Sequence, residues 1–323
     1  MFDLIGDIHG YAERLETLLL SLGYHKTAEG YAHPTRRAIF LGDVIDRGPE
    51  QVKAYRIVRA MVEAGNADLI MGNHEYNAVA YATPHPTRPG EYLRAHSDSN
   101  LRQHRTFLDQ VGEGSALHEE IIDWFRSLPI YIDAPDFRAI HACWHADHVT
   151  FMQPFLDANN ALLPHAWYQT TEKNTPAYNA LETLLKGTEI ELPAGVTYLD
   201  QDGNERCKTR TRWWDEEAKT YRQAGLIAQA IADRLPDKEI PAANLLTYDQ
   251  AKLIFFGHYW MSGTPQRLSE RMACLDYSIG KGTRKGKLCA YRWNGEATLR
   301  EDGFVWVEHA APVHILKSES LEP

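Results

Sequence analysis

Three short blocks, each a glycine followed by aspartate or asparagine, constrain the fold of this 323-residue chain more than any other feature. They lie at residues 5–10 (Ile-Gly-Asp-Ile-His-Gly), 41–48 (Leu-Gly-Asp-Val-Ile-Asp-Arg-Gly) and 71–75 (Met-Gly-Asn-His-Glu). Each block follows a short apolar run typical of a buried strand and precedes a segment with helical periodicity. Open α/β sheets place their ligand sites where strands end and helices begin. The pattern therefore predicts a largely parallel, layered α/β domain with a site at one sheet edge.

The rest of the chain extends this pattern. Further strands are predicted at residues 129–132, 137–142 and 252–256, and antiparallel closing strands at 272–277 and 288–293. Helices are predicted after each block and at about 101–111, 117–128, 177–186 and 216–234. We expect one domain over 1–323, with an insertion or cap of helices and loops at 148–248.

Composition excludes several classes of protein. The chain is 44% hydrophobic and 24% charged, as in ordinary globular proteins, and its formal net charge of -10 argues against an extended nucleic-acid-binding surface. Four widely spaced cysteines without a CxxC pair indicate reduced thiols. No stretch approaches the roughly 20 apolar residues of a membrane span, and no signal sequence is recognisable. We therefore expect a cytoplasmic protein without a membrane partner.

The polar residues of the blocks suit a pair of metal ions. Two ions about 3.5–4 Å apart activate a water and clamp phosphoryl oxygens in phosphate-ester hydrolysis. Asp7 and His9 alternate at one strand end and can share one ion, and Asp43 is the natural bridge. The second ion would be completed by residues at three further strand ends, Asn73, His141 and His258. Each residue alone is more often a helix cap or a surface polar group, so the joint pattern carries the prediction.

The blocks resemble the signature of the calcineurin-like metallophosphoesterases. The Asp-Arg-Gly and Asn-His-Glu forms resemble, more narrowly, the phosphoprotein phosphatase branch, which includes bacterial diadenosine tetraphosphatases. The resemblance covers residues 2–81, with further matches at 140–142, 256–259 and 274–293. It implies a sandwich of two mixed β-sheets flanked by helices. The position two residues after His258 is Trp260, where many metallophosphoesterases have a histidine but this branch does not.

The resemblance also implies roles for the matching residues. Asp7, His9 and Asp43 would hold one divalent ion, and Asp43, Asn73, His141 and His258 the other. Mn²⁺ is the first choice, with Fe or Zn²⁺ as alternatives. Arg47 would bind phosphate oxygens, and His74, oriented by Asp46, would protonate the leaving oxygen.

A second phosphate-binding arginine is expected before the last histidine. The run at 209–214 (Thr-Arg-Thr-Arg-Trp-Trp) is the best candidate, because diadenosine tetraphosphatases carry a similar run. We prefer Arg212 to Arg210; the alternative is two solvated arginines on an edge strand. Tryptophans near the expected site, namely Trp213, Trp214 and Trp260, are candidates for stacking on an aryl group or nucleobase. His145 is a rival to His141.

Three functions follow. The first is hydrolysis of phosphomonoesters, including phosphoproteins, by attack of a metal-bridging hydroxide. The second is the same chemistry on the anhydride of a dinucleoside polyphosphate. The third is a scaffold on the same fold without catalysis, which the complete set of predicted ligands argues against. Expected partners are therefore a phosphorylated small molecule, a nucleotide or a phosphoprotein substrate.

Overall fold

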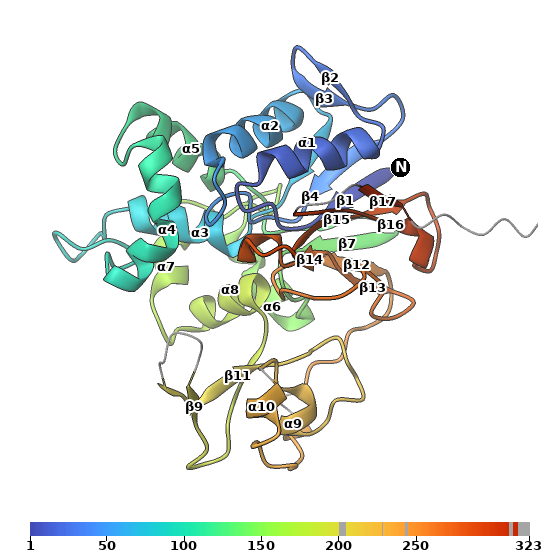
Figure 1. The fold of residues 1–323 in the computed structure, drawn as a ribbon. Helices are drawn as coiled ribbons and strands as arrows, with labels where there is room; N and C mark the ends of the chain where they lie inside the picture. Colours follow the sequence, from blue (N-terminus) through green and yellow to red (C-terminus); the bar gives the residue numbers. More distant parts are fainter. Residues whose placement is uncertain (200–204, 228, 243–244, 310–312, 316–323) are drawn as a thin grey trace, which may run out of the picture.

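The computed structural model describes residues 1–199, 205–227, 229–242, 245–309 and 313–315. Two mixed β-sheets dominate this part of the chain (Figure 1). The first has the order β17 (Val313–Ile315), β16 (Phe304–Glu308), β15 (Lys287–Trp293), β1 (Phe2–Ile5), β4 (Arg37–Phe40) and β5 (Ala67–Leu69), with β14 (Asp276–Tyr277) beside β15. The second has the order β13 (Met272–Cys274), β12 (Leu253–Phe256), β7 (Phe137–Ile140) and β6 (Tyr131–Asp133).

Parallel strands form the centre of each sheet. β1 pairs in parallel with β4, and β4 with β5, while β15 runs antiparallel to β1. In the second sheet β12 is parallel to both β13 and β7. The carboxyl ends of β1, β4 and β5 therefore lie at one edge of the first sheet, and the loops that follow them are brought together.

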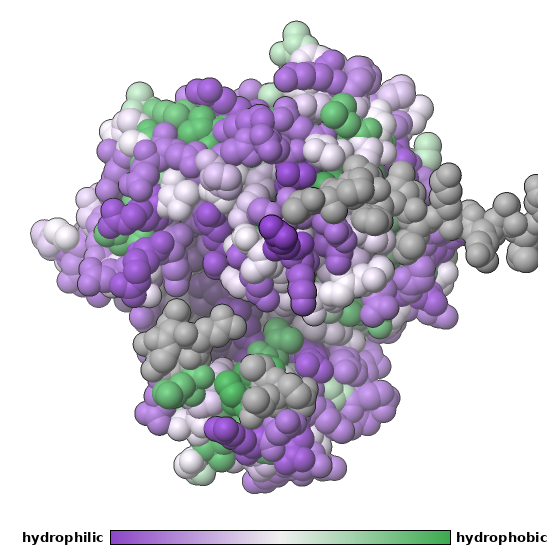
Figure 2. Space-filling model, viewed as in Figure 1, coloured by the Kyte–Doolittle hydropathy of each residue, from purple (hydrophilic) through white to green (hydrophobic). Residues whose placement is uncertain are grey.

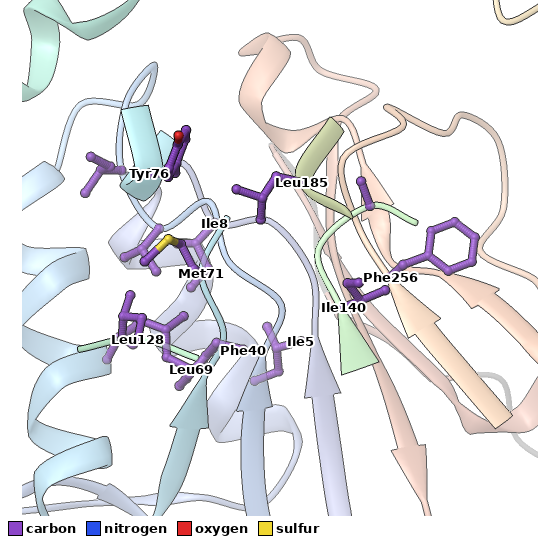
Figure 3. Close-up of a cluster of buried hydrophobic side chains, with 14 of the residues drawn as sticks. Ile5, Ile8, Phe40, Leu69, Met71, Tyr76, Leu128, Ile140, Leu185 and Phe256 are labelled. Atoms are coloured by element: carbon purple, nitrogen blue, oxygen red, sulfur yellow. The ribbon is translucent and has the colours of Figure 1, made fainter. Parts of the chain in front are cut away.

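The core lies between the sheets and beneath the helices. Side chains alternate along each strand, so Leu4 and Ile39 face Phe137 and Phe255 of the second sheet in one apolar cluster. The next residue along β1, Ile5, belongs to the other large cluster, which includes helix residues and is drawn in part in Figure 3. This arrangement confirms the predicted sandwich flanked by helices.

Helices cover both outer faces and one end of the sandwich (Figure 1). They are α1 (Ala12–Ser21), α2 (Gln51–Glu63), α3 (Asn73–Ala82), α4 (Asp98–Val111), α5 (Ala116–Arg126), α6 (Ala146–Met152), α7 (Ala166–Thr171) and α8 (Pro176–Lys186). Helix α1 buries Leu15, Leu18 and Leu19, and Leu22, just after its last residue, is buried as well. No helix in the described part of the chain is long and apolar enough to cross a membrane.

The predicted insertion contains a small apolar cluster of its own. Ile190, Leu192, Tyr221, Leu235 and Ile240 pack together there. The local elements are two-stranded pairings of β8 (Glu189–Glu191) with β11 (Lys208–Arg210) and of β9 (Tyr198–Leu199) with β10 (Glu205–Arg206), and two short helices, α9 (Tyr221–Ala224) and α10 (Gln229–Ala232). The boundaries 148–248 remain a prediction.

Two predictions, one of a helix and one of a strand, need correction. The helix expected at 216–234 is interrupted, because Gly225 leaves the helical conformation and bridges to Thr211. The strand expected at 272–277 is two strands in different sheets, divided at Leu275, whose N–H bonds to the Phe256 carbonyl. The chain between α1 and β4 also contains a hairpin that was not predicted, β2 (His25–Thr27) and β3 (Gly30–Ala32).

Candidate metal and active site

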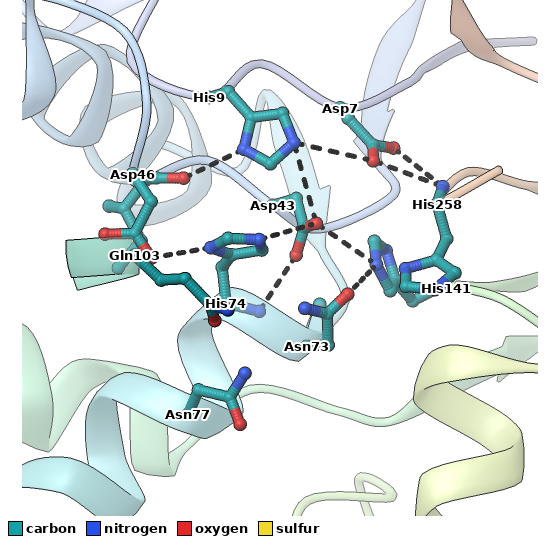
Figure 4. Close-up of polar contacts among 12 residues, drawn as sticks. Asp7, His9, Asp43, Asp46, Asn73, His74, Asn77, Gln103, His141 and His258 are labelled. Carbon is teal, nitrogen blue, oxygen red and sulfur yellow. Dashed lines mark hydrogen bonds and ion pairs between the residues drawn. The ribbon is translucent and has the colours of Figure 1, made fainter. Parts of the chain in front are cut away.

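The predicted metal ligands meet where the two sheets present their strand ends. Asp7 and His9 follow β1, Asp43 follows β4, and Asn73 is the first residue of α3, after β5. His141 follows β7 and His258 follows β12, so the second sheet supplies the other two. All six are at least 92% buried, and Figure 4 shows His9 and His141 facing Asp43, and Asp7 facing His258.

The backbone is strained where it presents these side chains. His9, Asp43 and His258 have φ values of 49°, 50° and 72°, in the left-handed region that non-glycine residues rarely adopt. Two glycines make room for close approach. A Cβ at Gly257 would lie 2.0 Å from the Asp7 carboxylate, and one at Gly42 would lie 2.5 Å from the Gly72 nitrogen. Strain of this kind persists where the surrounding structure fixes it, as at functional sites.

Glu75 holds the Asp43 loop in place. Its buried carboxylate accepts backbone N–H groups from Asp43 at 2.8 Å, Val44 at 2.9 Å and Gly72 at 3.0 Å. Burial and the charge of Asp43 raise the pKa of Glu75 to about 7. The sequence offered Glu75 only as part of the Asn-His-Glu block and predicted no role for it.

Replacing Glu75 by glutamine is expected to destabilise the protein. The amide NH₂ would face backbone donors, leaving at least one buried N–H without an acceptor, at a cost of about 2–3 kcal/mol. Urea unfolding monitored by circular dichroism measures the difference. Glu63→Gln is the matched control, because Glu63 pairs with Arg59 on the surface of α2 and should change stability by less than about 0.5 kcal/mol. Equal stability of the two variants would contradict this role of Glu75.

His9 has the protonation state that a metal ligand needs. Its Nδ1–H donates to the carbonyl of Ile45 at 3.1 Å, so Nε2 carries the lone pair. Nε2 lies 3.8 Å from Asp43 Oδ2 and 4.0 Å from Asp7 Oδ2, and is buried without a hydrogen-bond partner among the described residues. Burial lowers the pKa of His9 to about 3. A neutral imidazole therefore faces two carboxylates.

His141 and His258 form the other half of the centre. His141 Nδ1–H donates to the carbonyl of Leu41 at 2.7 Å, which directs Nε2 toward Asn73 Oδ1 at 3.1 Å and Asp43 Oδ2 at 3.4 Å. His258 Nε2 is buried and has no hydrogen-bond partner in the described structure. Burial lowers the pKa of His141, but the Asp43 carboxylate outweighs it and raises the value to about 10. The oxygens of Asp43 and Asn73 that converge on His141 and stabilise its proton can also stabilise a metal cation.

The donor set fits divalent metal ions. The ligand atoms of His9, Asp43 and His74 lie within 4.8 Å of one another, as do those of Asp43, His141 and His258. Asp43 is shared by both groups, which is the geometry of the predicted bridge. Asp7 is in neither group; its carboxylate accepts the His258 backbone N–H at 3.1 Å. Imidazole, carboxylate and amide donors together suit Mn²⁺, Fe or Zn²⁺.

His74 lies beside this centre and is held by two further residues. Its Nδ1 bonds to Asp46 Oδ2 at 2.5 Å, and its Nε2 lies 3.8 Å from Asp43 Oδ2. The other Asp46 oxygen accepts His104 Nδ1–H at 2.8 Å. Burial lowers the pKa of His74, but the carboxylates of Asp43 and Asp46 more than offset it and the pKa is raised. Such a histidine can carry a proton to a leaving group.

His104 was not predicted from the sequence. It lies on α4 and is 6% exposed. No motif marks it, because its contact with Asp46 spans 58 residues of sequence. Its periodicity with Phe107 and Leu108, which are also buried, would have indicated only the inner face of a helix.

Three of the predicted metal ligands, Asp43, Asn73 and His258, line a cleft of about 990 Å³. Figure 2 shows the molecule hollowed between its main body and the part that contains α9 and α10. Five cationic side chains line the cleft together with Asp43 and His74, namely Arg47, Arg94, Lys186, Arg210 and Lys281. The Arg47 guanidinium lies 4.5 Å from the centroid of the Trp260 ring.

The second arginine and the aromatic candidates need correction. Arg210 lines the cleft, whereas Arg212 is exposed and is not among the lining residues, so the preference for Arg212 is reversed. Trp213 and Trp214 are packing residues, 3% and 9% exposed, although Trp260 does line the cleft. The rival histidine, His145, lies against His148, with ring centroids 4.0 Å apart, and belongs to neither ligand group.

Comparison with known proteins gives matches over most of the chain. A family model for calcineurin-like phosphoesterases matches residues 1–259. The bis(5'-nucleosyl)-tetraphosphatase PrpE (asymmetrical) of Oceanobacillus iheyensis is 45% identical over 73 residues, which are 22% of this chain and 29% of that protein. The protein of the same name from Bacillus velezensis is 33% identical over 151 residues, 46% of this chain and 58% of that protein. The matches thus span less than two thirds of either relative.

Among solved structures, a cold-active protein-tyrosine phosphatase of a psychrophilic Shewanella species aligns with a TM-score of 0.50 and 17% identity. The alignment covers 98% of this chain and 80% of that one. At this identity the likeness concerns the fold alone.

Proposed function

Because this chain belongs to the calcineurin-like phosphoesterase family and is a metal-dependent phosphoesterase, we propose that it hydrolyses the phosphoanhydride chain of dinucleoside polyphosphates. Hydrolysis of phosphomonoesters, which the sequence placed first, becomes the second candidate. The curated relatives named bis(5'-nucleosyl)-tetraphosphatase support the change of order. A scaffold without catalysis is not retained.

The charge of the cleft carries this proposal. Five cationic side chains line it, and Asp43 is the one carboxylate among the described lining residues. A chain with a net charge of -10 thus gathers positive charge at the metal ligands. A single phosphoryl group needs one or two such partners, whereas a polyphosphate carries several anionic groups in a row.

The apolar part of the cleft lining suits a nucleoside. It is formed by aromatic and aliphatic side chains of the predicted insertion, namely Tyr198, Leu199, Leu226 and Ile227. Leu199 is 62% exposed, which is unusual for a large apolar residue. Apolar patches beside a polar site commonly contact the apolar part of a ligand. An adenosine attached to a polyphosphate presents both an apolar base and a row of anionic groups.

The side chains around the reacting phosphoryl group take the following roles. When bound, two divalent ions supply an activated water and neutralise phosphoryl charge; Asp7, His9, Asp43, Asn73, His141 and His258 would hold them. Arg47 and Arg210, which both line the cleft, bind phosphate oxygens. His74 donates its Nε2 proton to the leaving oxygen, and Asp46 keeps its ring in position.

The test is a comparison of substrates with Mn²⁺-loaded protein. We expect kcat/KM for diadenosine tetraphosphate to exceed that for an aryl phosphate and for a set of phosphopeptides by about tenfold or more, as multiple charge-assisted contacts require. Chromatography of the products identifies the bond that is cleaved. A phosphopeptide or aryl phosphate as the best substrate would contradict the proposal and favour the second candidate. Fe and Zn²⁺ are tested in parallel.

A further inference from the structure

Arg94 lies in the cleft but comes from outside every sequence motif. It belongs to the polar segment between α3 and α4, where its backbone N–H donates to the carbonyl of Ala80 at 2.9 Å. The segment is fixed by a stack of three rings, because His96 lies between Tyr81 at 3.8 Å and Tyr92 at 4.0 Å. Arg94 is therefore presented on an ordered support.

The guanidinium of Arg94 is held by amides. Nη1–H donates to Asn77 Oδ1 at 2.7 Å, and Nη2–H donates to Gln103 Oε1 at 3.2 Å. Among the described residues, no carboxylate lies within ion-pair distance of Arg94. Lys186 and Arg210 differ, because Lys186 contacts Glu182 and Arg210 lies 4.0 Å from Glu189.

This arrangement leaves Arg94 without a carboxylate in direct contact among the described residues. The side chain is half-buried, and burial lowers the pKa of Arg94 more than the charges of Glu182 and Asp46, which lie beyond ion-pair distance, raise it. Neutral amide acceptors satisfy its N–H groups and fix its orientation but do not balance its charge. An ordered, partly desolvated cation that faces an open cleft is suited to an external anion.

The position of Arg94 relative to the metal ligands sets which anion it can reach. Asn77 lies one turn beyond Asn73 on the same face of α3, a rise of about 6 Å along the helix. A rise of this size separates a group held at the predicted metal ligands from a group further along an extended substrate. A phosphoryl group at the metal ligands therefore leaves Arg94 beside a phosphate further along the same chain.

We propose that Arg94, positioned by Asn77 and Gln103, binds the phosphates of a polyphosphate chain that lie beyond the phosphate under attack. The inference rests on the proposed function and deepens it. Arg94 thereby distinguishes polyphosphate substrates from monoesters, which end at the attacked phosphate.

Two variants test the site in different ways. Arg94→Met removes the charge and keeps most of the side-chain stem. Asn77→Asp keeps Arg94 but places a carboxylate in contact with its guanidinium group. In both, the ratio of kcat/KM for diadenosine tetraphosphate to that for an aryl phosphate should fall about tenfold or more. The matched control is Arg88→Met, on the same segment, because Arg88 pairs with Glu172 at 2.9 Å and does not line the cleft. Its ratio should equal that of the wild type.

A second readout uses inorganic tripolyphosphate as a competitive inhibitor of aryl phosphate hydrolysis. Its inhibition constant should rise about tenfold or more in Arg94→Met and Asn77→Asp and stay unchanged in Arg88→Met. Unchanged inhibition in the first two variants would overturn the inference. If the wild type does not prefer diadenosine tetraphosphate, the proposed function fails, and weakened inhibition in the two variants would still establish the anion site.

Discussion

Replacing Asp43 by asparagine is expected to abolish turnover, with a loss of about 10³-fold or more in kcat. Asp43 is the one carboxylate whose ligand atom belongs to both groups of potential metal ligands. An amide at this position keeps the shape but removes the negative charge that His9, His141 and His258 share. Both ions should therefore bind more weakly, and mass spectrometry of the dialysed protein should find less than two metal equivalents.

Asp46→Asn is the control for the loss of metal ions. Asp46 is buried near Asp43, but its oxygens bond to His74 and His104 and to none of the predicted ligands. This variant should keep its full metal content and lose activity only through the misplacement of His74. If Asp43→Asn kept two metal equivalents and wild-type turnover, the assignment of Asp43 as the bridge would be wrong.

The meeting of the predicted metal ligands in one place could be expected from the sequence, because it follows from strand ends. Asp7, Asp43 and Asn73 each stand just beyond a short apolar strand, and neighbouring parallel strands end at one edge. The exact strand limits mattered little. The strand expected directly before the third block lies at Ala67–Leu69, and Asn73 is the first residue of the helix that follows.

The choice between Arg210 and Arg212 could not be made from the sequence. Residues two apart on a strand point to the same face, so spacing gives both arginines one orientation. In the structure β11 ends at Arg210, and the Arg212 side chain is exposed. The end of a strand three residues long depends on its pairing with β8, which is a tertiary contact.

His104 and Arg94 could not be predicted from the sequence for a related reason. Both come from the connection between α3 and α5 and reach the site by packing, with Asp46 in one case and Asn77 in the other. Neither occupies a strand end. The placement of α4 brings His104 to the Asp46 carboxylate and Gln103 to the Arg94 guanidinium.

The second large effect is expected at His74. His74→Asn should lower kcat for phenyl phosphate, whose leaving group is poor, by about 10²–10⁴-fold, the usual contribution of a general acid. For p-nitrophenyl phosphate, whose leaving group needs no proton, the loss should be much smaller. Steady-state kinetics on a series of aryl phosphates measures this as a steeper dependence of rate on the pKa of the leaving group.

This dependence separates two roles that the geometry allows for His74. Its Nε2 lies 3.8 Å from Asp43 Oδ2 and belongs to a possible ligand group, so it could hold a metal ion instead of a proton. The bond of Nδ1 to Asp46 at 2.5 Å favours the acid, because the carboxylate stabilises the protonated ring. A ligand role would lower the metal content of His74→Asn and reduce kcat equally for both leaving groups. An acid role leaves the metal content intact and concentrates the loss on the poor leaving group.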